Sequence, residues 1–220
     1  MKRLLITCLM TLIMCSGCAW FQTKENLPAH ELASNGMEAF SSGHYRNAIE
    51  SFEKLKDWYP FSQYAILAEL KIADAHYHLK EYEDAVAAYE EFESLHPRNE
   101  AVPYVIFQTG LCYYEQISSV DRDQTSARKS ADIFTRVTDR YPDNEYAQRG
   151  SRLLKECMKQ LCGHDLYVGK FYLKSKHYKA ALCRFKQILT HYPDVGIHQE
   201  ALQYIALCEQ KLSGQQPEKE

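Results

Sequence analysis

One pattern of residues recurs four times along the chain, and it restricts the fold more than any other feature. An aromatic residue is followed three positions later by alanine, four positions after that by a second aromatic residue, and eight positions later by proline. The clearest copies begin at Tyr45, Tyr82 and Tyr178, and a degenerate copy contains Phe134. Such a repeat is typical of helical hairpins, which bury their apolar sides only against one another. The sequence therefore predicts an all-α solenoid of stacked hairpins.

The repeat is that of the tetratricopeptide (TPR) unit, which has about 34 residues. The prolines that close the four copies, Pro60, Pro97, Pro142 and Pro193, are 37, 45 and 51 residues apart. The second gap therefore has a surplus of about 11 residues and the third a surplus of about 17, measured against the standard unit. The first surplus falls at residues 117–125, between two helices. The second has the length of one additional helix.

The extra length predicts a helical segment at residues 145–174. It is either one long helix or two helices bent near Cys162 and Gly163, because glycine costs about 1 kcal/mol inside a helix. With it, the solenoid has about nine or ten helices. Within the first hairpin, the small residues Gly36 and Ala48 predict that the paired helices approach closely at these positions. Phe52 is expected to fill the adjoining space. Helices are expected at residues 28–41, 45–59, 61–79, 82–95, 102–116, 126–140, 145–174, 178–191 and 195–211.

These helices divide into two expected halves. Residues 28–142 form an N-terminal half of three hairpins, and residues 143–212 contain the long helix and the last TPR hairpin. Residues 213–220 are polar and are expected to be a flexible tail. We expect the two halves to form one curved body.

The first 17 residues have the features of a bacterial lipoprotein signal peptide. Lys2 and Arg3 precede an apolar run too short for a membrane-spanning helix, which needs about 20 residues. Ser16 and Gly17 precede Cys18, which is the expected lipidation site, and residues 18–27 form a lipidated tether. An ordinary signal peptide with an incidental cysteine is the alternative. Resemblance of the following residues to known lipoproteins implies an outer-membrane location, with attachment through the lipid anchor only.

The formal net charge of the whole chain is −3, which gives no basic face for nucleic acid. We find no Ser-His-Asp or Cys-His arrangement and therefore expect neither an enzyme nor a cofactor. Cys157, Cys162 and His164 have a spacing that fits no standard metal site, so we expect no metal. Five cysteines lie on or near apolar helical stripes and are expected to be mostly buried thiols, namely Cys112, Cys157, Cys162, Cys183 and Cys208.

Two segments resemble the BamD family, the outer-membrane lipoproteins of the β-barrel assembly machine. They are the run Asp-Arg-Asp-Gln-Thr at residues 121–125 and the run Leu-Tyr-Val-Gly at residues 166–169. The resemblance covers about residues 28–212. It implies a periplasm-facing scaffold that binds the POTRA domains of the barrel-inserting protein BamA and helps to receive unfolded outer membrane proteins. It also implies further lipoproteins of the same BAM complex as partners.

The resemblance implies a partner-binding role for Arg184, which would pair with an acidic residue of a POTRA domain. Two bland alternatives are a solvated arginine and an internal salt bridge to the neighbouring helix. An arginine at the rim of an interface is a common anchoring contact, but ion pairs on a protein surface are usually weak.

The first helices of the TPR hairpins line the concave face and suggest a substrate groove. In the first two hairpins its candidate residues are Met37, Phe40, Asp74, Tyr77 and His78, whose aromatic and thioether groups would suit an extended peptide. The alternative is that the aromatic residues simply pack between hairpins, as most aromatic residues at helical spacing do.

The inserted segment includes Asp121, Arg122 and Asp123, which form a candidate contact loop for a partner. The alternative is structural, because an aspartate or Thr125 can cap the helix that follows.

Two other functions compete with barrel assembly. One is a generic TPR lipoprotein adaptor that bridges envelope or cell-division complexes. The other is an enzyme with a TPR-like shell, such as a lytic transglycosylase, which would need a separate catalytic domain for which no residues remain.

Overall fold

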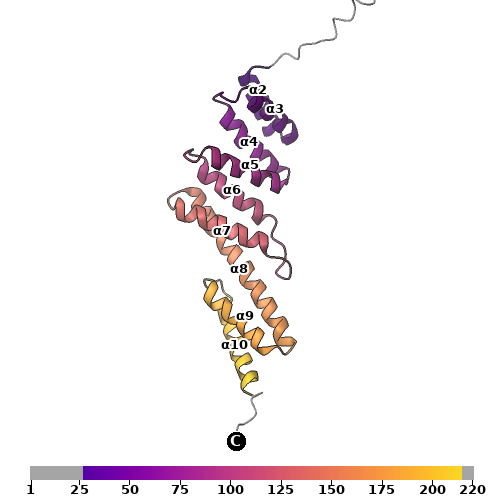
Figure 1. The fold of residues 1–220 in the computed structure, drawn as a ribbon, viewed down its shortest axis with the longest axis vertical. Helices are drawn as coiled ribbons and strands as arrows, with labels where there is room; N and C mark the ends of the chain where they lie inside the picture. Colours follow the sequence, from indigo (N-terminus) through magenta and orange to yellow (C-terminus); the bar gives the residue numbers. More distant parts are fainter. Residues whose placement is uncertain (1–26, 215–220) are drawn as a thin grey trace, which may run out of the picture.

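The computed structural model describes residues 27–214, which form nine α-helices and no β-strand. The helices follow one another along an elongated body with its first and last helices at opposite ends (Figure 1). The all-α TPR prediction is therefore confirmed for this part of the chain. The helices are α2 (Ala29–Ser41), α3 (Tyr45–Trp58), α4 (Ala65–His78), α5 (Tyr82–Leu95), α6 (Val102–Tyr114), α7 (Thr125–Arg140), α8 (Glu145–Lys174), α9 (Tyr178–His191) and α10 (His198–Ser213).

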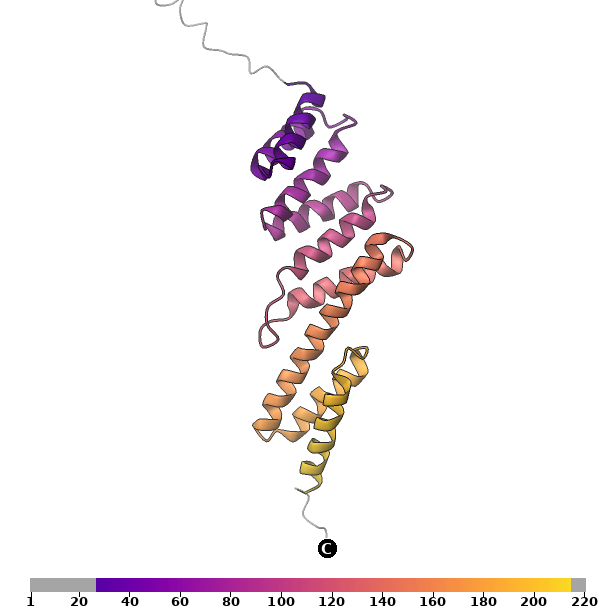
Figure 2. The ribbon, with the colours of Figure 1, turned by 180° about the vertical axis from the view of Figure 1, so that it is seen from behind.

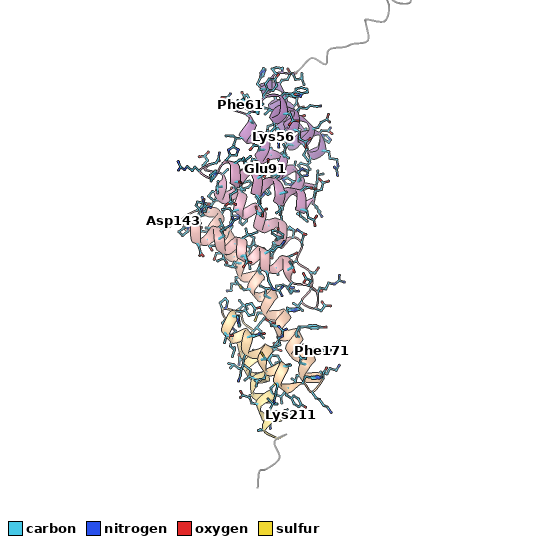
Figure 3. The ribbon with its side chains drawn as sticks, in the orientation of Figure 1. Lys56, Phe61, Glu91, Asp143, Phe171 and Lys211 are labelled. Carbon is cyan, nitrogen blue, oxygen red and sulfur yellow. The ribbon has the colours of Figure 1, made fainter. Side chains whose placement is uncertain are left out.

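Two helices begin later than the sequence predicted, each for a local reason. The helix expected from residue 61 begins at Ala65, because residues 59–65 form turns in which the Ser62 hydroxyl accepts the Tyr64 N–H at 3.2 Å. Phe61 is left fully exposed on this connection (Figure 3). The closing helix begins at His198 and not near residue 195, because Gly196 has a φ of +90°.

Three hairpins turn through the same backbone geometry. The residue two positions before the aromatic that opens the second helix has a positive φ: +76° at Gly43, +61° at Lys80 and +61° at Lys176. At each turn the next N–H bonds to a carbonyl five residues earlier, as in the 2.8 Å bond from His44 to Ala39. This pairing closes the last turn of the first helix. Glycine adopts this conformation freely, whereas lysine does so at a cost.

The small residue predicted at the hairpin crossing is required by an aromatic ring. A β-carbon on Gly36 would lie 2.5 Å from the Phe52 ring, and one on Gly110 would lie 2.6 Å from the Phe134 ring. Gly169 meets the Phe185 ring in the same way. These phenylalanines are completely buried, so the small and aromatic residues of the repeat are the ones that pack the paired helices closely together.

Helix α8 is one continuous helix of 30 residues, which decides between the two alternatives for this segment. Its N-terminus is capped by the Asn144 side chain, which accepts the Tyr146 N–H at 2.9 Å. Seen from behind, the helix runs obliquely along the body and connects the earlier hairpins to the last one (Figure 2).

The helices that pack against α8 change along its length, although the helix itself is continuous. Leu161 belongs to the hydrophobic core that α8 shares with α6 and α7, whereas the next residue, Cys162, belongs to the core shared with α9 and α10. Tyr192 packs against both cores. A single helix therefore supplies side chains to both cores. Residues 1–26 and 215–220 lie outside the described residues. They include the predicted signal peptide, Cys18, and most of the predicted tether and tail.

Candidate partner-binding surfaces

Arg184 of α9 is held by a buried carboxylate of α8. Its Nη1 donates to Asp165 Oδ1 at 3.0 Å, and the hydroxyl of Tyr192 donates to Asp165 Oδ2 at 2.9 Å. The internal salt bridge considered in the sequence analysis is thus present. The Arg184 side chain nevertheless remains 40% exposed, while that of Asp165 is only 10% exposed. The guanidinium has five N–H donors, so this geometry leaves donors oriented by Asp165 and open to solvent.

The candidate contact loop lies between α6 and α7, and Asp121, Arg122 and Asp123 are all exposed. The Ser119 hydroxyl bonds to Asp121, and the Thr125 N–H donates to Asp123 Oδ1 at 2.8 Å. These bonds lower the pKa of both aspartates below the ordinary value. Asp123 therefore helps to start α7, in agreement with the structural interpretation. Arg122 has no ion pair within residues 27–214 and is available to a partner.

The same loop is fastened to the middle of α8. The Gln160 amide donates to the Ser118 carbonyl at 2.7 Å, and His164 Nδ1 lies 2.6 Å from the Val120 carbonyl oxygen. The buried Gln124 side chain donates to two loop carbonyls and accepts from Gln160 at 3.1 Å. The two irregular segments of the sequence are therefore in direct contact. The repeat pattern did not predict this contact, because it lies outside the repeat positions.

The groove candidates on α2 and α4 form an aromatic cluster. The ring centroid of Phe40 lies 5.6 Å from that of His78, and Tyr77 lies 5.8 Å from His78. Tyr45, which was not among the predicted groove residues, stacks on His78 with 4.7 Å between the ring centroids. The phenol of Tyr77 has its pKa raised to about 12, chiefly by burial. Met37 lies three residues before Phe40 on α2 and is 38% exposed, and His78 is also exposed. This part of the first two hairpins therefore presents both a thioether and a ring to solvent.

Asp74 lies beneath this surface and is only 2% exposed. Its Oδ1 accepts the hydroxyls of Tyr89 at 2.8 Å and Tyr104 at 2.7 Å, and its Oδ2 accepts from Lys71 Nζ at 2.7 Å. These three donors come from α5, α6 and α4. Asp74 therefore joins the second hairpin to the third. Because it is buried, it can stabilise the helices that carry the groove residues but is not itself available to a peptide.

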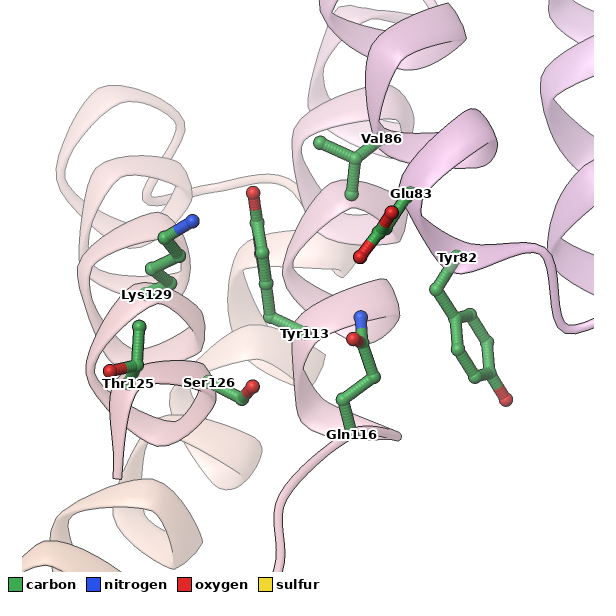
Figure 4. A pocket seen from close by; sticks show the side chains of 8 residues that line it. All are labelled: Tyr82, Glu83, Val86, Tyr113, Gln116, Thr125, Ser126 and Lys129. Atoms are coloured by element: carbon green, nitrogen blue, oxygen red, sulfur yellow. The ribbon is translucent and has the colours of Figure 1, made fainter. Parts of the chain in front are cut away.

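A pocket that the sequence analysis missed lies between α5, α6 and α7. It has a volume of about 300 Å³, near the lower limit for a ligand site. Tyr113 rises between Lys129 and Glu83, and Lys129 Nζ lies 4.9 Å from the Tyr113 ring centroid (Figure 4). Ligand groups of both charges could be held here. No sequence motif marks the pocket, whose lining residues are Tyr82, Glu83, Val86, Tyr113, Gln116, Thr125, Ser126 and Lys129.

Metal-ligand geometry is limited to one group within residues 27–214. The ligand atoms of His76, Glu81 and Asp84 lie within 4.8 Å of one another. Glu81, however, already pairs with Arg46 at 2.6 Å and with His76 at 2.9 Å. A cation would have to displace Arg46, so this cluster is better described as an ion-pair network that links the first two hairpins.

The loop at residues 117–125 and the long helix that contains Asp165 interrupt the generic repeat, whereas Arg184 lies within its last copy. A family model described as "YfiO: Outer membrane lipoprotein" matches residues 25–220, which includes all of these segments. The chain belongs to this family, that of the BamD lipoproteins. The BamD resemblance of the two sequence segments is thereby confirmed.

Curated relatives named "Outer membrane protein assembly factor BamD" cover most of the chain. The protein of Caulobacter vibrioides is 30% identical over 85% of this chain, which spans 63% of that relative's length. The Rickettsia prowazekii protein is 29% identical over 92% of this chain and 81% of its own length. The protein of Neisseria gonorrhoeae is 27% identical over 96% of this chain and 85% of its own length.

Solved structures support the fold alone. The TPR2AB domain of yeast Sti1, solved as a complex with pHSP90, is similar with a TM-score of 0.52 and 14% sequence identity. The match covers 84% of this chain and 71% of the Sti1 chain. In the part of this BamD-family chain that the structure describes, no helix has the length and apolar character needed to cross a membrane.

Proposed function

We propose that this chain is a lipid-anchored scaffold in the assembly of outer membrane proteins, facing the periplasm and attached through Cys18. Its relatives are named as assembly factors, and the family is one of outer-membrane lipoproteins. An elongated solenoid with exposed candidate contacts at several levels is suited to binding proteins.

Arg184 is the proposed contact for a POTRA domain of the barrel-inserting protein BamA. The observation that supports this role most directly is the Asp165 carboxylate, which fixes an arginine that remains 40% exposed. A fixed guanidinium loses little conformational freedom when it meets a carboxylate of a partner. Arg122 on the contact loop is a second proposed contact for the assembly machinery, including its smaller lipoproteins.

The experiment measures the affinity of the full lipoprotein, in detergent, for a purified POTRA fragment of the cognate BamA. Arg184→Gln should weaken binding by about tenfold, since an interface arginine is often a dominant contact. Arg184→Glu should weaken it further, but it also places a carboxylate beside buried Asp165, so its thermal midpoint must be measured in parallel. Arg152→Glu, at an exposed site on α8, is the control and should leave affinity unchanged.

Unchanged binding in Arg184→Gln contradicts the proposed contact. If the unaltered lipoprotein instead recovers division or cell-wall proteins from detergent-solubilised membranes, with no POTRA-bearing barrel, then the generic adaptor is the better function.

The aromatic cluster near Met37 is the proposed surface for unfolded outer membrane proteins. Met37→Glu should weaken binding of a synthetic peptide from the C-terminus of such a protein, because a carboxylate would replace an apolar contact. Trp58→Glu is the matched control, since Trp58 is 40% exposed and Met37 is 38% exposed. Equal effects of both substitutions would exclude the cluster as the specific surface.

A further inference from the structure

The connection between α3 and α4 carries an exposed apolar surface. We define the apolar edge as Trp58, Phe61, Ile66 and Leu67. All four side chains are exposed, and that of Phe61 is completely so. They are four of the nine exposed large hydrophobic residues within residues 27–214. Single exposed apolar residues need no explanation, but four of them within ten residues indicate a contact surface.

The apolar edge belongs to an uncharged run of the chain. Residues 58–68 contain no aspartate, glutamate, lysine, arginine or histidine, although a quarter of the residues of the whole chain are charged. The run is bounded by Asp57, which is exposed, and by Glu69, which pairs with His96 at 2.6 Å. A partner of this surface is therefore bound through burial of apolar area and not through charge.

The ring of Phe61 is held outward by an ordered turn. The Ser62 N–H donates to the Tyr59 carbonyl at 2.9 Å, and the Ala65 N–H donates to the Ser62 carbonyl at 3.0 Å. Tyr59 and Tyr64, on either side of Phe61, pack against the hydrophobic core of α2, α3 and α4. The ring lies at the outer edge of the first two hairpins (Figure 3). Its exposure is therefore a property of the fold.

The same turn contacts the point at which the predicted lipid tether meets the folded body. The Tyr59 hydroxyl donates to the Leu27 carbonyl at 3.1 Å, and Leu27 is the first residue that the structure describes. Cys18, the predicted lipidation site, is nine residues earlier. An extended chain spans at most about 3.6 Å per residue, so Cys18 lies within about 30 Å of Leu27. The apolar edge is therefore within reach of the membrane that holds the lipid.

We propose that the apolar edge is a membrane-binding surface that enters the interfacial region of a phospholipid bilayer. The inference rests on the proposed function, because it requires lipid attachment at Cys18. Phe61 contributes apolar area at the boundary of the acyl chains. The indole N–H of Trp58 has no hydrogen-bond partner within residues 27–214 and bonds to a headgroup, at the depth where tryptophan is enriched. Attachment at two points restricts the orientation of the elongated body relative to the membrane.

A lipid surface fits the apolar edge better than a protein partner does. Because Phe61 projects fully from the body, a folded partner would need a matching cavity, whereas acyl chains deform around the ring. The uncharged run also offers no ion pair that would fix the orientation of a protein or an extended peptide. The tether keeps lipid at a high effective concentration beside the edge, which no diffusing partner shares.

The test measures the fluorescence of Trp58 in the full lipoprotein, reconstituted in phosphatidylcholine vesicles. The chain has two tryptophans, so Trp20→Phe leaves Trp58 as the only one. Brominated acyl chains quench an indole that touches them, and they should reduce the fluorescence of Trp58 to about half or less of that in unbrominated vesicles. Because the edge is uncharged, the quenching should not depend on salt.

Two controls show whether the contact is specific. Phe61→Asp, in the Trp20→Phe background, should abolish most of the quenching without changing the midpoint of thermal unfolding, because Phe61 is fully exposed. Leu202→Asp, at a 54% exposed site of α10, should leave the quenching unchanged. Phe171→Trp, in a chain without Trp20 and Trp58, places the only indole on the distant part of α8 and should give no quenching.

The other outcomes contradict the inference in distinguishable ways. If Trp58 is not quenched, or is quenched equally in Phe61→Asp or no more than in Phe171→Trp, the membrane contact is wrong, and the proposed function stands provided that the POTRA fragment still binds. If the unaltered lipoprotein does not float with vesicles, the lipid anchor and the inference are both wrong. If Phe61→Asp weakens binding of the outer-membrane-protein peptide in detergent while Trp58 is unquenched, the edge binds peptides instead.

Discussion

Val120 of the contact loop packs on Gly163 of α8, with 3.2 Å between Val120 Cγ1 and the position of a β-carbon on residue 163. The neighbouring residues Gln160 and His164 contact the backbone of the same loop. A glycine within a long helix is thus explained by a contact between distant segments.

Gly163→Leu should release the contact loop, because the leucine side chain would occupy the space of Val120. The expected loss of stability is about 1–3 kcal/mol from overpacking, offset by about 1 kcal/mol from better helix propensity. Limited proteolysis at residues 117–123 should become faster. Arg152→Leu, at an exposed position of the same helix, is the control. Equal proteolysis of both variants would show that Gly163 does not hold the loop.

Lys80→Gly should stabilise the second hairpin by about 1 kcal/mol, because lysine is strained at the φ of +61°. Gly43→Lys should have the opposite sign at the equivalent turn, where φ is +76°. Thermal unfolding of both variants gives the comparison. Lys80→Ala keeps the strain and should change little, so stabilisation by alanine as large as that by glycine would point to a cause other than backbone conformation.

Asp74→Ala should destabilise the protein by about 3–5 kcal/mol, because it leaves Lys71 and two tyrosine hydroxyls without their buried acceptor. Tyr89→Phe removes one of these bonds and should cost only about 1 kcal/mol. Urea unfolding measures both free energies. A smaller loss for Asp74→Ala than for Tyr89→Phe would contradict the role of Asp74 as the shared acceptor.

The same network predicts loss of stability at alkaline pH. Burial, followed by the Asp74 carboxylate, raises the pKa of Tyr89 and Tyr104 well above the ordinary 10.0. The unfolded chain therefore loses these protons first, so the stabilisation is complete below about pH 10 and decreases as the pH rises further. The midpoint of thermal unfolding should fall less steeply above pH 10 in Tyr89→Phe. Parallel curves would mean that Tyr89 does not contribute.

The cysteines should differ in reactivity. Cys183 is exposed, whereas the other four cysteines of residues 27–214 are buried free thiols. Burial raises the pKa of Cys112 to about 12 and that of Cys162 to about 11, and only the thiolate reacts. In a soluble form that starts after Cys18, a disulfide reagent at neutral pH should modify one thiol rapidly. Cys183→Ser should remove this fast phase, and a remaining fast thiol would contradict the burial of the others.

The repeated hairpins could be predicted from the sequence because their determinants are local. Gly36 and Phe52 lie 16 residues apart in one hairpin and meet through the ordinary geometry of two short helices. Spacing also located the loop at residues 117–125 and the long segment at residues 145–174. Arg184 and the groove aromatics could be selected by residue type and family resemblance, but their roles stay predictions.

Sequence by itself thus determined the fold class, the order of the hairpins and the places where the repeat is interrupted. Only the tertiary structure decided that α8 continues through Gly163, that Asp74 is buried, and that Tyr167 and Phe171 stay exposed. The physical reason is separation along the chain: Gln160 and His164 bind loop carbonyls 42 and 44 residues away. Local periodicity contains no information about such contacts. The presence of a glycine inside a helix, or of an exposed aromatic ring, can therefore be explained only when the positions of the neighbouring segments are known.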